Sequence, residues 1–229
     1  MPSEQEHLER IQQSIISGDD HESVQATADA LTAGVTAANI LDNGLMKGAA
    51  IMGQRFQAGE FFLPELMLAG RALKAAMAVV EPFLQATVSG EADTSETGIV
   101  VTATVQTDIH DIGKNIVGSM LTASGFKVTD MGVNVPIEDV IAKAHEINAN
   151  IIGLSALLTT SMPFMKALIK LLNERGERQQ FKVMVGGASV TAEWAKDIGS
   201  DGTAPNAIQA VALAKRLIRE QRQEREAAG

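Results

Sequence analysis

The chain of 229 residues contains no cysteine and no tyrosine, and its aromatic content is only 3%. The absence of cysteine excludes a disulfide, a thiolate zinc site and a cysteine nucleophile. Because aromatic side chains are scarce, aliphatic residues and methionine must fill the interior. The hydrophobic content of 45% is ordinary for a globular protein and is sufficient for that purpose.

The chain also lacks an excess of basic residues, since its net charge is -9. That balance argues against a nucleic-acid partner, because phosphate binding needs a basic surface. The first residues, MPSEQEHLER, lack the basic-then-apolar order of a secretory signal. No uninterrupted apolar run is long enough to span a bilayer. We therefore expect a cytoplasmic protein with neither a nucleic-acid nor a membrane partner.

A polar, acidic segment, SGEADTSET, divides the chain at residues 89–97 and predicts an interdomain linker. Residues 1–88 show helical spacing and no convincing strand, so they predict an antiparallel helical bundle. Within it, Pro64 stands at a predicted first helical position, and that helix is expected to end near Pro82. Residues 98–229 form the predicted second domain, which ends in a charged helix.

The second domain alternates apolar runs with helical patterns, which is typical of a doubly wound parallel sheet. Five strands are predicted, at residues 98–105, 126–132, 150–156, 181–187 and, as a stub, 199–203. Five such units suit the flavodoxin-like strand order 2-1-3-4-5. The predicted fold class is thus α/β, with an N-terminal helical bundle before a Rossmann-type five-stranded sheet flanked by helices.

Ligands of such sheets bind beyond the carboxyl ends of the strands, at the switch point between strands one and three. The loop after the first strand reads QTDIHDIG, the loop after the third contains ALLTTS, and the fourth strand ends in GGAS. We expect these three segments to converge on one edge of the sheet. A site there would combine a histidine, several hydroxyl groups and a bare glycine pair.

His110 is the central candidate, although a lone histidine is more often structural. A metal-ligating imidazole usually donates its second N–H to a carboxylate, and Asp108 could accept it. Asp111 is better placed to cap the following helix, and Gly113 leaves room for a bulky group near the first turn. One imidazole cannot hold a bare metal ion tightly. Any metal bound here would have to arrive already chelated, inside a cofactor.

The glycine pair Gly186-Gly187 has a simple alternative interpretation as a strand-end turn. It is not followed by the Lys-Ser/Thr of a Walker motif, and the first strand is not followed by G-x-G-x-x-G, so nucleotide cofactors are disfavoured. Four hydroxyl residues occur within seven positions of the third loop, which is more than helix capping requires. They suit the polar tail of a ligand. These residues are Ser155, Thr159, Thr160 and Ser161.

Together these residues resemble a known family. The pattern Asp108-x-His110-x-x-Gly113, then Ser155-x-Leu157, then Gly186-Gly187 is similar to the signature of cobalamin-binding domains. The longer DIHDIGKNIVG closely resembles the cobalamin module of methionine synthase and the corrinoid proteins of methyltransferase systems. The segment MGQRFQAGEFFLPELMLAGRALKAAM resembles their helical cap. The resemblance covers nearly the whole chain, in the family's order.

The resemblance implies a site in which the corrin lies between the two domains. His110 would be the lower axial ligand of the cobalt, with Asp108 and Ser161 completing a proton relay behind it. In the cap, Phe56 and Leu63 would shield the upper face, and Asp42 would contact the corrin edge. The other implied cofactor-binding residues are Thr107, Ile109, Asp111, Gly113, Ser155, Leu157, Thr159, Gly186, Gly187 and Ala207. Relatives often carry an aromatic residue where this chain has Thr203.

The function implied is that of a corrinoid methyl carrier whose cofactor is cobalamin, as methylcobalamin or a related corrinoid. It would accept a methyl group from a substrate-specific methyltransferase and deliver it to a second methyltransferase acting on tetrahydrofolate or a thiol. A reductive activator would be a third partner, and the chain would not turn over alone. Three alternatives remain: a cobalamin-responsive regulator, the detached cobalamin subunit of a mutase, and a flavodoxin-like module without a cofactor.

Overall fold

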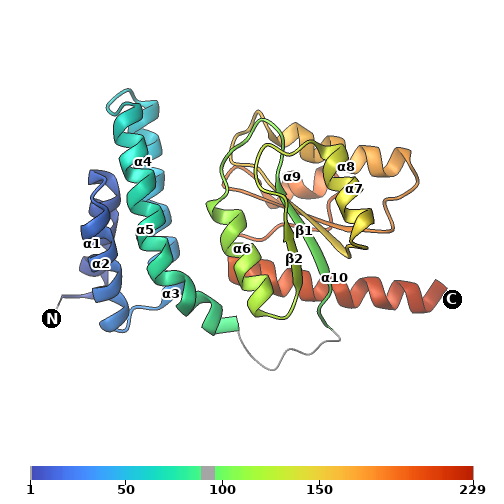
Figure 1. Ribbon diagram of the computed structural model, residues 1–229, viewed down its shortest axis with the longest axis horizontal. Coiled ribbons are helices and arrows are strands. Elements are labelled where there is room, and N and C mark those ends of the chain that lie inside the picture. The colour runs from blue at the N-terminus through green and yellow to red at the C-terminus, as the bar shows by residue number, and fades with distance from the viewer. Residues whose placement is uncertain (1, 89–95, 229) are drawn as a thin grey trace. The chain divides into compact units, whose positions relative to one another are not determined.

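The computed structural model describes residues 2–88 and 96–228, and the chain divides into two compact units, Met1–Thr87 and Val88–Gly229 (Figure 1). Most of the predicted linker at residues 89–97 lies outside the described residues, so its character as a linker stays a prediction. None of the helices in the described ranges combines the length and the apolar composition needed to cross a lipid bilayer. The two units are taken in turn.

The first unit is entirely helical in its described part, as predicted. Its elements are α1 (Glu4–Ser17), α2 (Asp20–Thr32), α3 (Ala37–Asn39), a π-helical turn η1 (Ile40–Leu45), α4 (Met46–Gln57) and α5 (Leu63–Val88). Helix α1 begins with a capping box, in which the side chain of Ser3 accepts from the backbone of Glu6 and the Glu6 carboxylate accepts from the backbone of Ser3. These local signals, readable in the sequence, fix where the helix starts.

Glycines mark close contacts between helices of this unit. A Cβ at Gly48 of α4 would lie 3.1 Å from Gln12 Cα, so α1 and α4 approach backbone to backbone. Gly18, with φ at 69°, makes the left-handed turn from α1 into α2, and a Cβ there would lie 2.6 Å from Leu68 Cβ in α5. Glycine at these two positions therefore allows the helices to approach closely.

The predicted end of the last helix near Pro82 is wrong, because α5 continues through Pro82 to Val88. Proline inside a helix removes one backbone hydrogen bond and normally favours termination. Here Val80 and Leu84, each two positions from Pro82, are almost completely buried, at 0% and 1% exposure. Burial of these two side chains offsets the lost hydrogen bond, and periodicity alone did not reveal that.

The second unit alternates strands and helices. Its elements are β1 (Ile99–Thr104), α6 (Ile112–Ala123), β2 (Lys127–Asp130), α7 (Ile137–Glu146), β3 (Ile151–Ser155), α8 (Met162–Glu174), β4 (Lys182–Gly186), α9 (Ala192–Asp197) and α10 (Ala207–Ala228). The strands are parallel, in the order β2-β1-β3-β4. The α/β class and the switch point between β1 and β3 are therefore as predicted.

The sheet has four strands in the described residues, so the prediction of a fifth is wrong. The expected stub at 199–203 contributes only an isolated bridge between Met184 and Gly202. Two features explain its brevity. Gly202 has a φ of 155°, and the side chain of Asp201 takes the N–H of Val183 at 2.5 Å, where a fifth strand would have supplied a backbone carbonyl.

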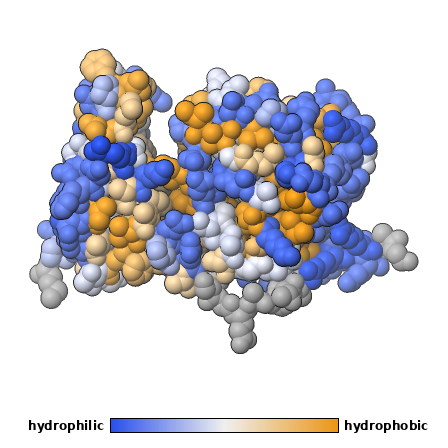
Figure 2. Space-filling model, in the orientation of Figure 1, coloured by the Kyte–Doolittle hydropathy of each residue, from blue (hydrophilic) through white to orange (hydrophobic). Residues whose placement is uncertain are grey.

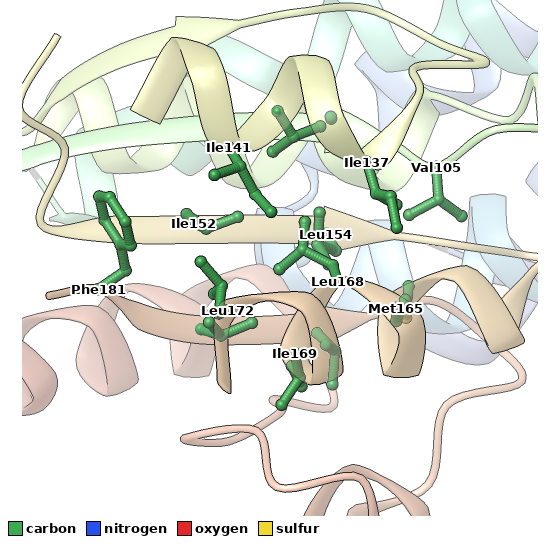
Figure 3. Close-up of a cluster of buried hydrophobic side chains, with 14 of the residues drawn as sticks. Val105, Ile137, Ile141, Ile152, Leu154, Met165, Leu168, Ile169, Leu172 and Phe181 are labelled. Carbon is green, nitrogen blue, oxygen red and sulfur yellow. The ribbon is translucent and has the colours of Figure 1, made fainter. Parts of the chain in front are cut away.

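One face of the sheet packs against α7 and α8, and this is the main core of the unit (Figure 3). Alternate residues of the central strand β3, Ile152 and Leu154, point into it between the two helices. The opposite face carries α6 and α10, which contact each other. In Figure 3, α7 contributes Ile137 and Ile141 to this core, and α8 contributes Met165, Leu168, Ile169 and Leu172. A sheet with helices on both faces therefore supports the loops at its carboxyl edge.

Candidate functional site

Three loops meet at the carboxyl edge of the sheet, after β1, β3 and β4, as the sequence predicted. The carboxylate of Asp108, after β1, accepts hydrogen bonds from Leu157 and Leu158, after β3. Ser189, after β4, donates its hydroxyl hydrogen to the carbonyl of Leu157 at 2.7 Å. The loops after β3 and β4 approach very closely at Gly187, where a Cβ would lie 1.8 Å from the carbonyl oxygen of Ala156. Only glycine fits that position.

His110 and Asp108 form the pair that the sequence suggested. The ring Nδ1 of His110 lies 2.7 Å from Oδ1 of Asp108, and the His110 backbone N–H donates to the same oxygen at 3.0 Å. An ionised carboxylate accepts only, so Nδ1 carries the hydrogen and the neutral ring keeps its lone pair on Nε2. The His110 side chain is 48% exposed while that of Asp108 is 0% exposed. The imidazole is thus anchored on its buried side and accessible on the other.

Asp108 is a hub of four hydrogen bonds. Besides the two from His110, its Oδ2 accepts the backbone N–H groups of Leu157 at 2.8 Å and Leu158 at 2.9 Å. Burial by itself raises the pKa of Asp108, but the hydrogen bonds from Leu158, His110 and Leu157 together outweigh burial and lower this pKa below its ordinary value. The carboxylate is therefore ionised and fully coordinated by donors. Leu158 was not among the predicted site residues, since a backbone donor leaves no sequence signal.

Ser161 and Thr107 lie together beside this pair. Ser161 is completely buried, and its Oγ lies 2.9 Å from Oγ1 of Thr107. The partner that the structure gives Ser161 is thus Thr107, which neighbours Asp108 in the chain. A direct place for Ser161 in a relay with Asp108 stays a prediction.

The other predicted residues of the first loop sit at the start of α6. Asp111 occupies the N-cap position but its side chain makes no capping bond, so the expectation of a cap is wrong. Its carboxylate instead accepts from the side chain of Asn115, one turn later, at 3.1 Å. A Cβ at Gly113 would meet nothing within 4 Å, which agrees with the expected open space there. Ile109, which precedes them between Asp108 and His110, is 73% exposed.

Apolar side chains are unusually exposed around His110. They come from the loops after β1, β2 and β3. Among the described residues of the second unit, Ile208 is the one other large apolar residue with an exposed side chain. Figure 2 shows hydrophobic surface over this part of the unit. The four loop residues are Ile109, Val133, Leu157 and Leu158. An exposed apolar rim around an imidazole fits the face of a large, flat, hydrophobic ligand.

The face of the sheet opposite the main core bears small and polar residues where a ligand tail was expected. Gly153, in the central strand, is only half-buried, and a Cβ at Gly186 would meet nothing within 4 Å. Thr102, directly opposite Gly153 in the ladder, is 4% exposed. Its Oγ1 is buried and has no hydrogen-bond partner within the described ranges. An orphaned hydroxyl beside bare glycines fits a polar group supplied by a ligand.

The remaining predicted residues of this unit differ in exposure. Ser155 is half-buried at the end of β3, and Thr159 is exposed in the loop that follows. Ala207, the first residue of α10, is 7% exposed, so it presents little side chain to any ligand. The preceding Asn206 caps α10 by accepting the N–H of Gln209 at 2.9 Å.

In the first unit, the predicted residues Phe56 and Leu63 are 41% and 61% exposed and lie at the end of α4 and the start of α5. Three further apolar residues, Phe62, Met67 and Leu68, are exposed beside them in the sequence, and Figure 2 shows hydrophobic surface at this end of the unit. Such an accumulation is more than a soluble surface usually carries.

Asp42 lies in the π-helical turn η1, a rare conformation that is frequent at functional sites. Although the residue is exposed, the protein around its carboxyl group removes part of its hydration, which raises the pKa of Asp42.

The described residues contain no group of three or more His, Asp or Glu side chains that could hold a metal ion. A metal bound at the His110 imidazole would therefore need its other ligands from a cofactor. A macrocycle supplies these, and the apolar rim around His110 would accept its flat face. The donor set, the rim and the orphaned Thr102 hydroxyl thus fit a metal macrocycle that carries a polar tail.

Comparison with known proteins decides which macrocycle this is. A B12 binding domain family matches residues 98–212, and a second B12 binding domain family matches residues 7–81. The chain is 42% identical over 218 residues to dimethylamine corrinoid protein 1 of Methanosarcina mazei, a match that covers 95% of this chain and 99% of the relative. The chain belongs to the B12-binding corrinoid proteins.

Solved structures of corrinoid proteins agree with this membership. The monomethylamine corrinoid protein of Methanosarcina barkeri matches with a TM-score of 0.83 and 37% identity, over 94% of this chain and 100% of that chain. The methanol:cobalamin methyltransferase complex of the same organism matches with a TM-score of 0.50 and 26% identity, over 96% of this chain and 84% of that chain. The cofactor of this corrinoid protein is accordingly cobalamin or a close analogue.

Proposed function

We propose that this corrinoid protein carries a methyl group between two methyltransferases. When bound, the corrinoid supplies a cobalt centre that can take up and release a methyl group. The observation that carries the proposal is the His110 imidazole, whose side chain is 48% exposed while its Nδ1 is held by a buried carboxylate. That arrangement favours a ligand for a metal which already has an equatorial set of donors.

Each residue has a defined task in this proposal. His110 would hold the cobalt through Nε2. Asp108 keeps the hydrogen on Nδ1 and strengthens Nε2 as a donor, because a negative partner stabilises positive charge that develops on the ring. Ser161 steadies the loop through Thr107. Phe56 and Leu63, which are exposed apolar residues of the helical unit, are proposed to shield the bound cofactor from water and oxygen.

The polar tail of the cofactor is proposed to extend along the sheet face that bears Thr102 and Gly153, toward the glycine pair Gly186-Gly187. The open space at Gly186 and the unpartnered hydroxyl of Thr102 support this course. Ser155 and Thr159 add hydroxyl groups at the mouth of the same strip. In this proposal His110, and not the base of the corrinoid's own tail, would supply the nitrogen donor to the cobalt.

For the methyl donor, methylamines are the first class to test. The relatives whose names state a methylamine are 42% and 37% identical to this chain, whereas the structure whose name states methanol is 26% identical. The acceptor enzyme, acting on tetrahydrofolate or a thiol, and a reductive activator remain part of the proposal. The chain itself is proposed to have no turnover without them.

The proposal is tested by loading the full chain with cobalamin and reducing it to the paramagnetic cobalt(II) form. Electron spin resonance, with histidine labelled by nitrogen-15, should show hyperfine splitting from an imidazole nitrogen. The variant His110→Ala should lose that splitting and retain the chain's helical content. Transfer of labelled methyl from methylamine, in the presence of methylamine:corrinoid methyltransferases, should appear on the loaded protein. Splitting from the cofactor's own base in the unmodified protein would contradict the proposal.

A further inference from the structure

Three non-glycine residues of the described chain have a positive φ, and two of them meet at the site. These are Thr107 at 70° and Asn134 at 53°, while the third, Asn148 at 52°, lies between α7 and β3 at the opposite edge of the sheet. Asparagine tolerates the left-handed region, but a β-branched threonine does so at a cost of order 1 kcal/mol or more. Thr107 therefore needs surroundings that hold it there.

Asn134 supplies those surroundings through two hydrogen bonds that form a closed clamp. The backbone N–H of Thr107 donates to Oδ1 of Asn134 at 2.8 Å. In return, the backbone N–H of Asn134 donates to the carbonyl oxygen of Asp108 at 2.9 Å. The loop after β2 thus holds two consecutive residues of the loop after β1, Thr107 and Asp108, and Asp108 stands two positions before the histidine.

The opposite side of Thr107 is also fixed. Its hydroxyl lies 2.9 Å from that of Ser161, which is completely buried at the start of α8. With its N–H bound to one loop and its hydroxyl to another, Thr107 has little freedom to leave the left-handed conformation. The direction of the chain into Asp108, and so the aim of the carboxylate at His110 Nδ1, depends on that conformation.

We propose that Asn134 is a positioning residue for the imidazole of His110. It holds Thr107 left-handed, and Thr107 in turn directs the Asp108 carboxylate so that His110 keeps its hydrogen on Nδ1 and its lone pair outward. The identity of the metal at Nε2 rests on the proposed function, but the clamp itself does not. The alternative is that Asn134 is only a turn residue, chosen for its φ.

Three variants separate these two roles. Asn134→Gly keeps the left-handed backbone and its N–H but removes the side-chain acceptor. Asn134→Asp restores an oxygen acceptor at the same position and tolerates the same φ. Asn148→Gly is the matched control, since Asn148 has nearly the same φ and its backbone N–H donates to His145 at the other edge of the sheet.

The first measurement uses the protein without cofactor. Amide hydrogen exchange at Thr107, corrected for global stability, should become about tenfold faster in Asn134→Gly, the effect of losing one hydrogen bond. It should be close to the original rate in Asn134→Asp and in Asn148→Gly. Nitrogen-15 shifts of the His110 ring at one fixed pH should show a smaller share of the Nδ1–H tautomer in Asn134→Gly alone. An unchanged Thr107 exchange rate or an unchanged tautomer share in that variant would overturn the proposal.

The second measurement uses the cobalamin-loaded protein. The fraction of cobalt(II) that shows imidazole splitting should fall in Asn134→Gly, recover in Asn134→Asp and stay unchanged in Asn148→Gly. Equal fractions in all proteins would refute a positioning role. If the unmodified protein itself lacked imidazole splitting, the proposed function would fail. The exchange rate and the tautomer share of the free protein would then still decide whether Asn134 positions His110.

Discussion

Replacing Asp108 by asparagine tests how the carboxylate controls the imidazole. The carboxylate has four donors around it, two on each oxygen. Asparagine has one oxygen and one NH₂ group, so it can satisfy only one side. With the NH₂ toward Leu157 and Leu158, two part-buried backbone N–H groups lose their acceptor. With the NH₂ toward His110, one backbone N–H loses its acceptor, and the ring can adapt by moving its hydrogen to Nε2.

The magnitudes favour the second orientation. A hydrogen bond to a charged group contributes about 1.5 to 3 kcal/mol, and an unsatisfied buried donor costs a similar amount. Losing both backbone donors would therefore cost about 3 to 6 kcal/mol, whereas losing the one at His110 costs about half of that. Since a domain is stable by only about 5 to 15 kcal/mol, the cheaper orientation dominates and the variant remains folded. The ring then carries hydrogen on Nε2, where the lone pair should be.

Urea unfolding and electron spin resonance check the two halves of this reasoning. Asp108→Asn should lower the free energy of unfolding by about 1.5 to 3 kcal/mol and should lose most of the imidazole splitting of the cobalt(II) form. Asp197→Asn, at an exposed position in the last turn of α9, removes the same charge and serves as the control. Full imidazole splitting in Asp108→Asn, at equal cofactor occupancy, would refute the tautomer argument.

Three further predictions follow from the same geometry. Gly187→Ala should unfold the second unit or lower its unfolding free energy by more than about 3 kcal/mol, because its φ is 132° and the new Cβ would meet the carbonyl of Ala156. A Cβ at Gly186 would meet nothing within 4 Å, so Gly186→Ala should keep the unfolding free energy of the unmodified protein in a urea titration. It should nevertheless bind cobalamin more weakly in a spectral titration. Equal effects of the two variants would contradict the assignment of Gly187 to close packing and of Gly186 to the cofactor. In the folded protein the pKa of Asp108 lies below its ordinary 3.8, so its contribution to stability should be fully present above about pH 5 and should be lost as the pH falls through the folded pKa. The difference in unfolding free energy between the unmodified protein and Asp108→Asn should therefore shrink only in acid. A difference that shrank with rising pH would contradict the lowered pKa. Phe56→Ala should make the methylated protein more sensitive to photolysis, measured by the rate of spectral bleaching, and an unchanged rate would argue against a shielding role.

The pairing of His110 with Asp108 could be predicted from the sequence because it depends on local geometry. Both residues stand just beyond the end of a buried strand, two positions apart, and the carboxylate reaches back to its neighbour's ring. The parallel order of the strands was likewise predictable, since alternation of strand and helix leaves few other topologies. These features need no information about which distant loops touch.

The partners of Thr107 could not be predicted, because they depend on the register of three loops. Asn134 and Ser161 are 27 and 54 residues away from it in the chain. Asn134, in GVNVP, had a weak signal as a residue that tolerates a left-handed turn before a proline. Nothing in the sequence said that its side chain would accept the N–H of Thr107. The missing fifth strand has the same origin, because the Asp201 side chain competes for the N–H of Val183 only once the two segments lie together.

The hydrogen-bond donors of Asp108 explain which substitutions the site can tolerate. Its two strongest constraints outside the histidine come from the backbone N–H groups of Leu157 and Leu158, which residues of many kinds would supply equally well. The side chains of these two leucines point away to the exposed apolar rim. Another side chain at either position would therefore change the apolar rim without disturbing the carboxylate. A proline there would lack the backbone N–H, so Asp108 would lose one of its donors. In the proposed site, different atoms of the same two leucines would orient the imidazole and contact the macrocycle: the backbone N–H groups hold Asp108, and the exposed side chains face the ligand.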